Sequence, residues 1–219
     1  MIDAHKSFEF VEERAERDRA IGGLLQNKVI ICGGENEKEY TLQDCFMVGQ
    51  PKNSFQMLEK RKSAASIVLN QNKILWVTGG NGGVKDKEST ELISLDQQQQ
   101  PLFVQGPVFP FKIKSHSMVE TSPNCIYIIG GIQNGLISDK TWIVDQSKNF
   151  EITPGPPLKR EREGHCCSKM KIDGRMFLVV ACGNSHWIDD RGEVTGGVNF
   201  KSVELLDLDA KNPQWQKGK

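Results

Sequence analysis

The sequence has no long apolar run, because none of its hydrophobic stretches approaches the roughly 20 residues that a membrane-spanning helix needs. It also has no excess of charge, since 28 Lys and Arg residues balance 28 Asp and Glu residues. Domains that bind nucleic acid or anionic membranes usually carry a basic excess. We therefore expect a protein that binds neither nucleic acid nor a membrane.

A secretory signal is missing from the N-terminal stretch MIDAHKSFEFVEERAERDR, which lacks an apolar core. This favours a cytoplasmic location, where thiols stay reduced. We expect the six cysteines to be free, with disulfides Cys32–Cys45 and Cys167–Cys182 remaining as alternatives.

Phosphate-binding loops are absent as well. The stretch KILWVTGGNGG, residues 73–83, ends an apolar run in two glycine pairs. A P-loop would continue with Gly-Lys-Ser/Thr and a dinucleotide fingerprint with a helix, but neither follows. We interpret these glycines as structural, supplying positive φ and close backbone approach, and we expect no cofactor.

What the sequence does contain is a repeat. Apolar runs end in a glycine pair at Gly34, Gly80 and Gly131, and a fourth run ends in Cys-Gly at Gly183. The intervals are 46, 51 and 52 residues, a period typical of repeat folds such as propellers. The motif residues are Gly33, Gly34, Gly79, Gly80, Gly130, Gly131 and Gly183, with Cys182 in place of the eighth glycine.

Other sequence features recur at the same intervals as the glycine pairs. Each unit continues with a second apolar strand, an aromatic residue (Phe55, Phe103, Phe150 or Trp215), a loop, and a basic stretch before a small-residue strand. This indicates about four short strands per unit, which cannot bury both faces without stacking on neighbours. The units span about 18–60, 61–112, 113–160 and 161–219, after a polar segment 1–17.

Gly-Gly after a strand, Glu-x4-Asp in the next strand, an aromatic, Gly-Pro and Arg…His together resemble the kelch repeat. The resemblance covers residues 18–219 and implies an all-β fold, a kelch-type β-propeller of four-stranded blades. About four blades are present, fewer than is usual in that family, so the propeller is incomplete or is closed by segment 1–17. That segment would supply the last strand of unit four or form a short helix.

Kelch propellers bind other proteins through their loops, so the resemblance implies a protein-interaction scaffold and not an enzyme. It suggests substrate recognition for a ubiquitin ligase or cytoskeletal binding, with another protein as the partner. An incomplete propeller would also favour self-association.

The loop after Gly183 is the longest of its kind. It takes 21 residues to reach the next strand, against 9 to 11 in the other units. Insertions of this kind often mark a binding face, and Trp and Arg are frequent interface anchors. We predict partner contacts by His186, Trp187, Asp189, Asp190 and Arg191, joined by Asn81, Lys85, Gln133 and Asn134 of the shorter loops.

The alternative is a propeller enzyme or a carbohydrate-binding protein, secreted and with closed disulfides. Kelch-like oxidases hold copper through Tyr and His, but this chain has two Tyr and four His at dissimilar repeat positions. We therefore predict no catalytic residues.

A zinc site in unit four is a second alternative. A hairpin turn at residues 173–174 would gather two histidines and two cysteines, a set that can bind zinc. His165 shares the repeat position of His116, however, so we interpret it as structural and predict no metal. The four residues are His165, Cys167, Cys182 and His186.

Overall fold

The computed structural model describes residues 17–188 and 194–218. Its regular elements are β-strands apart from one turn of 3-10 helix, η1 (Gln146–Lys148). Four antiparallel sheets of four strands follow one another along the chain, one within each repeat unit. The expectation of an all-β chain built from four-stranded sheets is therefore confirmed.

The sheets use these strands. Sheet 1 contains β1 (Ile21–Leu25), β2 (Lys28–Cys32), β3 (Asp44–Met47) and β4 (Gln50–Gln56). Sheet 2 contains β5 (Ala65–Leu69), β6 (Ile74–Thr78), β7 (Thr90–Leu95) and β8 (Pro101–Gln105). Sheet 3 contains β10 (Ser117–Ser122), β11 (Cys125–Ile129), β14 (Thr141–Asp145) and β15 (Glu151–Pro154). Sheet 4 contains β16 (Cys166–Ile172), β17 (Arg175–Ala181), β20 (Val203–Asp207) and β21 (Trp215–Lys217).

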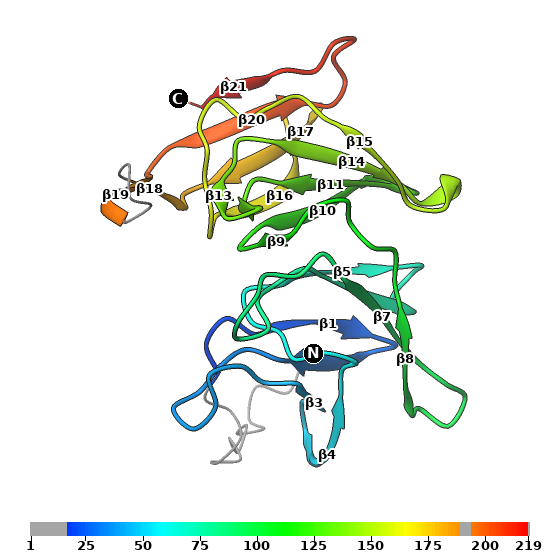
Figure 1. Cartoon of the computed structure of the whole chain (residues 1–219). Coiled ribbons are helices and arrows are strands. Elements are labelled where there is room, and N and C mark those ends of the chain that lie inside the picture. Colours follow the sequence, from blue (N-terminus) through cyan, green and yellow to red (C-terminus); the bar gives the residue numbers. More distant parts are fainter. Residues whose placement is uncertain (1–16, 189–193, 219) are drawn as a thin grey trace, which may run out of the picture.

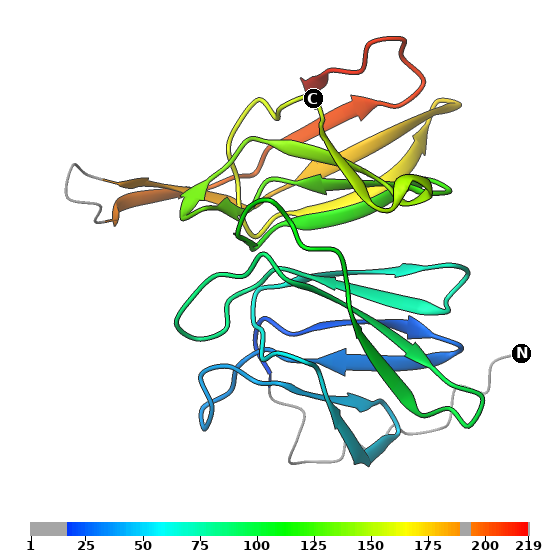
Figure 2. The same cartoon turned by 45° about the vertical axis from the view of Figure 1, so that its right-hand side comes forward.

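Shorter strands lie outside these sheets. They are β9 (Ile113–Lys114), β12 (Ile132–Gln133), β13 (Leu136–Ile137), and the hairpin of β18 (Asn184–Ile188) and β19 (Val194–Asn199). Figure 2 shows this hairpin projecting from the side of the molecule where the loops after the glycine pairs gather.

The last strand of sheet 4 is β21, which pairs with β20 in the register Leu206↔Trp215. Unit four thus completes its own sheet, and this place is not left for the N-terminal segment. The strand or helix expected in segment 1–17 otherwise falls on residues 1–16, outside the described residues.

The sheets stack in chain order, with sheets 1 and 4 at opposite ends (Figure 1). Strand β1 contacts β5, β5 contacts β10, and β10 contacts β16. Three clusters of buried apolar side chains fill the spaces between successive sheets, which is how each unit buries a face that it cannot bury alone. Typical members are Ile30 with Val77, Trp76 with Ile128, and Tyr127 with Val180.

The first glycine of each pair lies against the backbone of the next unit. A Cβ on Gly79 would lie 2.2 Å from the carbonyl oxygen of Ile113, and one on Gly33 would lie 2.3 Å from that of Arg61. Both glycines also have positive φ, 59° and 60°. A side chain at these positions would force the neighbouring sheet away, so glycine is required here for both reasons.

Two buried arginines stand four residues before the first strands of sheets 2 and 4. Arg61 Nε donates to Glu91 Oε1 at 2.9 Å, and Arg61 Nη1 donates to the Gly79 carbonyl at 2.7 Å. Arg162 Nη2 donates to Glu204 Oε1 at 2.6 Å. None of the four charged side chains is more than 2% exposed, so each pair is a fully desolvated ion pair.

The same positions are occupied differently in the other two units. Unit three has the apolar residues Ile113 and Trp142 in place of the ion pair. Unit one keeps the arginine as Arg17, which is ion-paired with Asp44, while Phe46 takes the place of the glutamate with its ring centre 5.0 Å from the guanidinium. The same pair of positions is therefore filled by a buried ion pair in units two and four and by apolar side chains in unit three.

Cys32 and Cys45 face each other across β2 and β3 and form a disulfide, with their Cα atoms 4.0 Å apart. Both side chains are fully buried. The expectation of six free thiols is wrong for this pair, because antiparallel register brings the two sulfurs into contact. Cys125, Cys166, Cys167 and Cys182 are free.

We expect reduction of this disulfide to lower the free energy of unfolding by about 3 kcal/mol, from the chain entropy of a loop of this length. The two cysteines are 13 residues apart. Urea unfolding with and without a reductant measures the difference. The variant Cys32→Thr/Cys45→Thr, which copies the Thr78–Thr90 pair of sheet 2, should not respond to the reductant. An unchanged urea midpoint for the wild type would contradict the prediction.

Among the described residues, no helix is long and apolar enough to cross a membrane.

Candidate functional site

Four short turns, one from each unit, meet near the centre of the stack. Each contains a residue with positive φ just before a first strand: Arg19 (55°), Ser63 (53°), Ser115 (52°) or Gly164 (58°). The N–H of Ser63 donates to the Arg19 carbonyl at 3.1 Å, and the N–H of Ser115 to the Ser63 carbonyl at 2.8 Å. The N–H of Gly164 donates to the Ser115 carbonyl at 3.0 Å. We call this series of three hydrogen bonds, from Arg19 through Ser63 and Ser115 to Gly164, the backbone ladder. It fixes the distance between successive units at this point.

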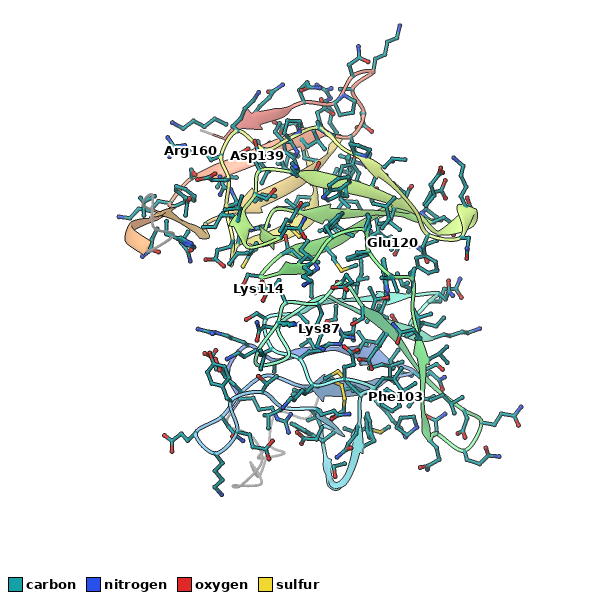
Figure 3. All side chains as sticks on the ribbon, viewed as in Figure 1. Lys87, Phe103, Lys114, Glu120, Asp139 and Arg160 are labelled. Atoms are coloured by element: carbon teal, nitrogen blue, oxygen red, sulfur yellow. A yellow bond between two sulfur atoms is a disulfide. The ribbon has the colours of Figure 1, made fainter. Side chains whose placement is uncertain are left out.

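A cavity of about 620 Å³ opens beside the backbone ladder, and we call it the central cavity. All four units contribute side chains to it, mostly polar or charged ones. In Figure 3 the labelled Lys114 lies between sheets 2 and 3. The polar lining comprises Arg19, Tyr40, Lys62, Ser63, Asn81, Lys114, Ser115, His116, Glu163, His165 and Asn184.

Ion pairs cross the unit boundaries around the central cavity. Lys62 of unit two lies 2.5 Å from Glu35 of unit one, whose other carboxylate oxygen is 3.1 Å from Arg19. Lys114 of unit three lies 2.9 Å from Asp86 of unit two. Each cation of the lining therefore has a nearby acid, so the cavity has both signs of charge.

An aromatic ring lies beside these charges. Tyr40 is 69% exposed, and the Lys62 ammonium sits 3.1 Å from the centre of its ring. The site thus combines an exposed aromatic ring with fixed charges of both signs, and the ammonium lies over the ring as in a cation–π contact.

Two histidines at equivalent repeat positions connect successive sheets. His116 Nε2 lies 2.8 Å from Thr78 Oγ1, and His165 Nε2 lies 2.7 Å from Ser117 Oγ. Burial lowers the pKa of His116 to about 3 and that of His165 to about 4, and the nearby Arg162 guanidinium lowers the pKa of His165 further. Both rings are neutral at pH 7 and act as structural links.

The zinc alternative does not match this geometry. The hairpin at residues 173–174 forms as expected, with Ile172 opposite Arg175. His165, however, is bound to Ser117, and burial raises the pKa of Cys167 to about 11. In residues 17–188 and 194–218, no group of three or more His, Cys, Asp or Glu side chains is arranged to hold a metal ion.

Two of the predicted contact residues lie at or beside the central cavity. Asn81 lines it, donates to Asp86 Oδ1 at 2.7 Å and accepts from the Gly83 N–H at 2.7 Å. His186 Nδ1 on β18 lies 3.6 Å from Glu163 Oε1, and Glu163 lines the cavity. The loops of units two and four thus do reach the same place.

Other predicted residues lie elsewhere. Gln133 and Asn134 line a second cavity of about 390 Å³ beside Phe111 and Trp142. Gln133 is buried and accepts from Trp142 Nε1 at 3.2 Å, so its amide supports the loop rather than facing a partner. Lys85 is exposed in the loop of unit two.

Asp189, Asp190 and Arg191 lie outside the described residues, as does the side chain of Trp187, whose backbone belongs to β18.

Most of the central cavity lining lies outside the contact residues predicted from the sequence. Arg19, Lys62, Lys114 and Glu163 belong to the stretches that precede the first strands, in which the sequence shows a repeat feature but no sign of a site. Lys62, Lys114 and Glu163 share one repeat position, three residues before a first strand, and Arg19 lies two residues before its own. Residues at such equivalent positions converge when repeat units stack around a common centre.

No family model matches this chain, and no curated protein does either. Among solved structures, the one described as "Structure of YjhT" is similar, with a TM-score of 0.68 at 16% sequence identity. The match covers 93% of this chain and 70% of that one. At this identity the similarity concerns the fold alone.

Proposed function

We propose that the chain is a kelch-type propeller, or an arc of one, that binds another protein at the central cavity and its surrounding loops. The convergence of equivalent turns from all four units on one cavity carries this proposal. Loops held by rigid sheets are a common way to build a recognition surface. A ubiquitin-ligase substrate receptor and a cytoskeletal scaffold are the two settings that the kelch resemblance suggests.

The composition of the central cavity supports protein binding. Its lining carries both signs of charge and an exposed tyrosine, and Tyr and Arg are the residue types that often dominate interface energetics. Figure 3 shows Asp139 and Arg160 near each other on the same side of the molecule. They line a further cavity of about 390 Å³ with Phe200, so the contact surface would extend toward unit four.

The test is affinity capture of partners with the intact chain and with variants of the lining. We expect Tyr40→Ala and Arg19→Ala each to weaken capture of a specific partner by about 10-fold or more, as for an interface anchor. Both side chains are more than half exposed, so the variants should fold normally.

The control is Val104→Ala, since Val104 is 58% exposed on the outer strand β8, away from the lining. Quantitative mass spectrometry of the captured proteins compares the three variants with the wild type. Partners retained equally by all of them would exclude the central cavity as the binding site.

A second candidate is a small polar ligand, such as a carbohydrate, bound by a secreted form of the protein. The cavity volume, within the range of small-molecule sites, and the Cys32–Cys45 disulfide favour this candidate. A thermal-shift screen with neutral and charged sugars separates the two candidates. A saturable rise in melting temperature that Tyr40→Ala abolishes would support the ligand.

A further inference from the structure

The outer face of sheet 4, which points away from sheet 3, is apolar, and within residues 17–188 and 194–218 no further four-stranded sheet packs on it. Val179 pairs with Leu205 and Ala181 with Val203 across β17 and β20, and all four are half-buried. The residues at the position of Val179 in sheets 2 and 3 are Trp76 and Tyr127, which are 0% and 6% exposed. This face therefore has the composition of a sheet–sheet interface. We define it by Phe177, Val179, Ala181, Val203 and Leu205.

A further sheet of the same kind does not fit this face in the register used inside the chain. At the first glycine of units one, two and three, an added Cβ would meet the next sheet's carbonyl oxygen at 2.3, 2.2 and 2.7 Å. Unit four has Cys182 at that position, with the same positive φ (61°) and an exposed side chain. A carbonyl docked there as in the other units would collide with the Cys182 Cβ.

We propose that the outer face of sheet 4 binds the same face of a second copy of this chain about a two-fold axis. Such a contact is isologous, so it needs only one self-complementary patch, and two apolar sheet faces can pack against each other. It does not require the register that Cys182 blocks.

The charges near the face are compatible with this partner. The five apolar side chains adjoin Cys166, Ser168 and Met170 of β16, so these neighbours include no Lys, Arg, Asp or Glu. Asp207 at the rim is ion-paired with Arg175. The whole chain has no net charge, so two copies would not repel each other.

Sedimentation velocity over a concentration series tests the association. Because one sheet face is a small contact, we expect a reversible dimer with a dissociation constant on the order of micromolar. Val179→Lys and Leu205→Lys should each raise that constant at least 10-fold. The control Val104→Lys places the same charge on β8 of sheet 2 and should leave it unchanged.

Thiol labelling gives a second, site-specific measurement. Cys166 is exposed and lies opposite Ala181 on the outer face of sheet 4. Its reaction rate with a thiol reagent should fall as protein concentration rises, and this protection should be absent in Val179→Lys. Circular dichroism of both lysine variants verifies that they are folded.

Three outcomes would overturn the proposal. A chain that stays monomeric up to about 100 μM, far above the expected constant, has no such contact. Dissociation by Val29→Lys as well would indicate a head-to-tail contact, because Val29 is 45% exposed on the outer face of sheet 1. A dimer whose Cys166 stays fully reactive would place the contact elsewhere. None of these results depends on whether the central cavity binds a partner.

Discussion

Arg61→Met should lower the free energy of unfolding by about 3–5 kcal/mol, the range for breaking a buried ion pair by removing one partner. The substitution leaves the Glu91 carboxylate at 0% exposure with only two backbone donors, the N–H groups of Leu58 and Glu59. It also removes the donors to the Gly79 and Ser89 carbonyls. Urea denaturation followed by tryptophan fluorescence measures the loss, since Trp76 lies in sheet 2.

The matched control for Arg61→Met replaces both partners. Arg61→Met/Glu91→Leu removes the buried negative charge and imitates unit three, where Ile113 and Trp142 fill the equivalent positions. We expect this double variant to be more stable than Arg61→Met alone, because no uncompensated charge remains. A double variant at least as unstable as the single one would mean that the loss came from packing and not from the charge.

Acidification from pH 7 to pH 5 should destabilise the protein by about 4 kcal/mol, about 2 from each of the two buried histidines. Burial holds the pKa of His116 at about 3 and that of His165 at about 4, whereas both titrate near 6.5 in the unfolded chain. Between those values the unfolded state binds more protons, so stability falls as the pH falls from 6.5. The loss stops growing below the folded-state pKa values, where both states are protonated.

Free energies of unfolding at pH 7, 6 and 5 measure this dependence, in a window above the usual titration of carboxylates. The variant His116→Gln/His165→Gln cannot gain these protons and keeps a polar group near the Thr78 and Ser117 hydroxyls. Its stability should change little over the same range. An equally steep profile in this variant would assign the acid sensitivity to other groups.

The four-sheet architecture could be predicted from the sequence because the glycine motif recurs at regular intervals. One glycine pair could have been a nucleotide loop, but the repeat at Gly34, Gly80 and Gly131 predicted a sheet at each position. The Asp173–Gly174 turn could also be predicted locally, since Asp-Gly is a common two-residue hairpin turn and the structure pairs the strands on either side of it. Long-range pairings were harder: Cys32 and Cys45 meet only because β2 and β3 are antiparallel neighbours in this register.

The candidate site was less accessible to sequence reasoning than the fold. Loop length drew attention to residues after Gly183, whereas the central cavity is built largely from short turns before the first strands. In the sequence, Lys62 and Lys114 cannot be told from ordinary surface charges, because only the stacking of their units brings them to the same cavity. Gln133 shows the opposite error, since a polar residue in a loop was assumed to be accessible and is buried.

The backbone ladder provides three reporters of how tightly the units are docked. The amide protons of Ser63, Ser115 and Gly164 each bond to the preceding unit, so each exchanges with solvent only when one particular boundary opens. Hydrogen exchange at these three amides would rank the boundaries by the free energy of opening. Because they border the central cavity, the same amides would report whether an occupant of the cavity tightens all four units together or only the pair that it touches.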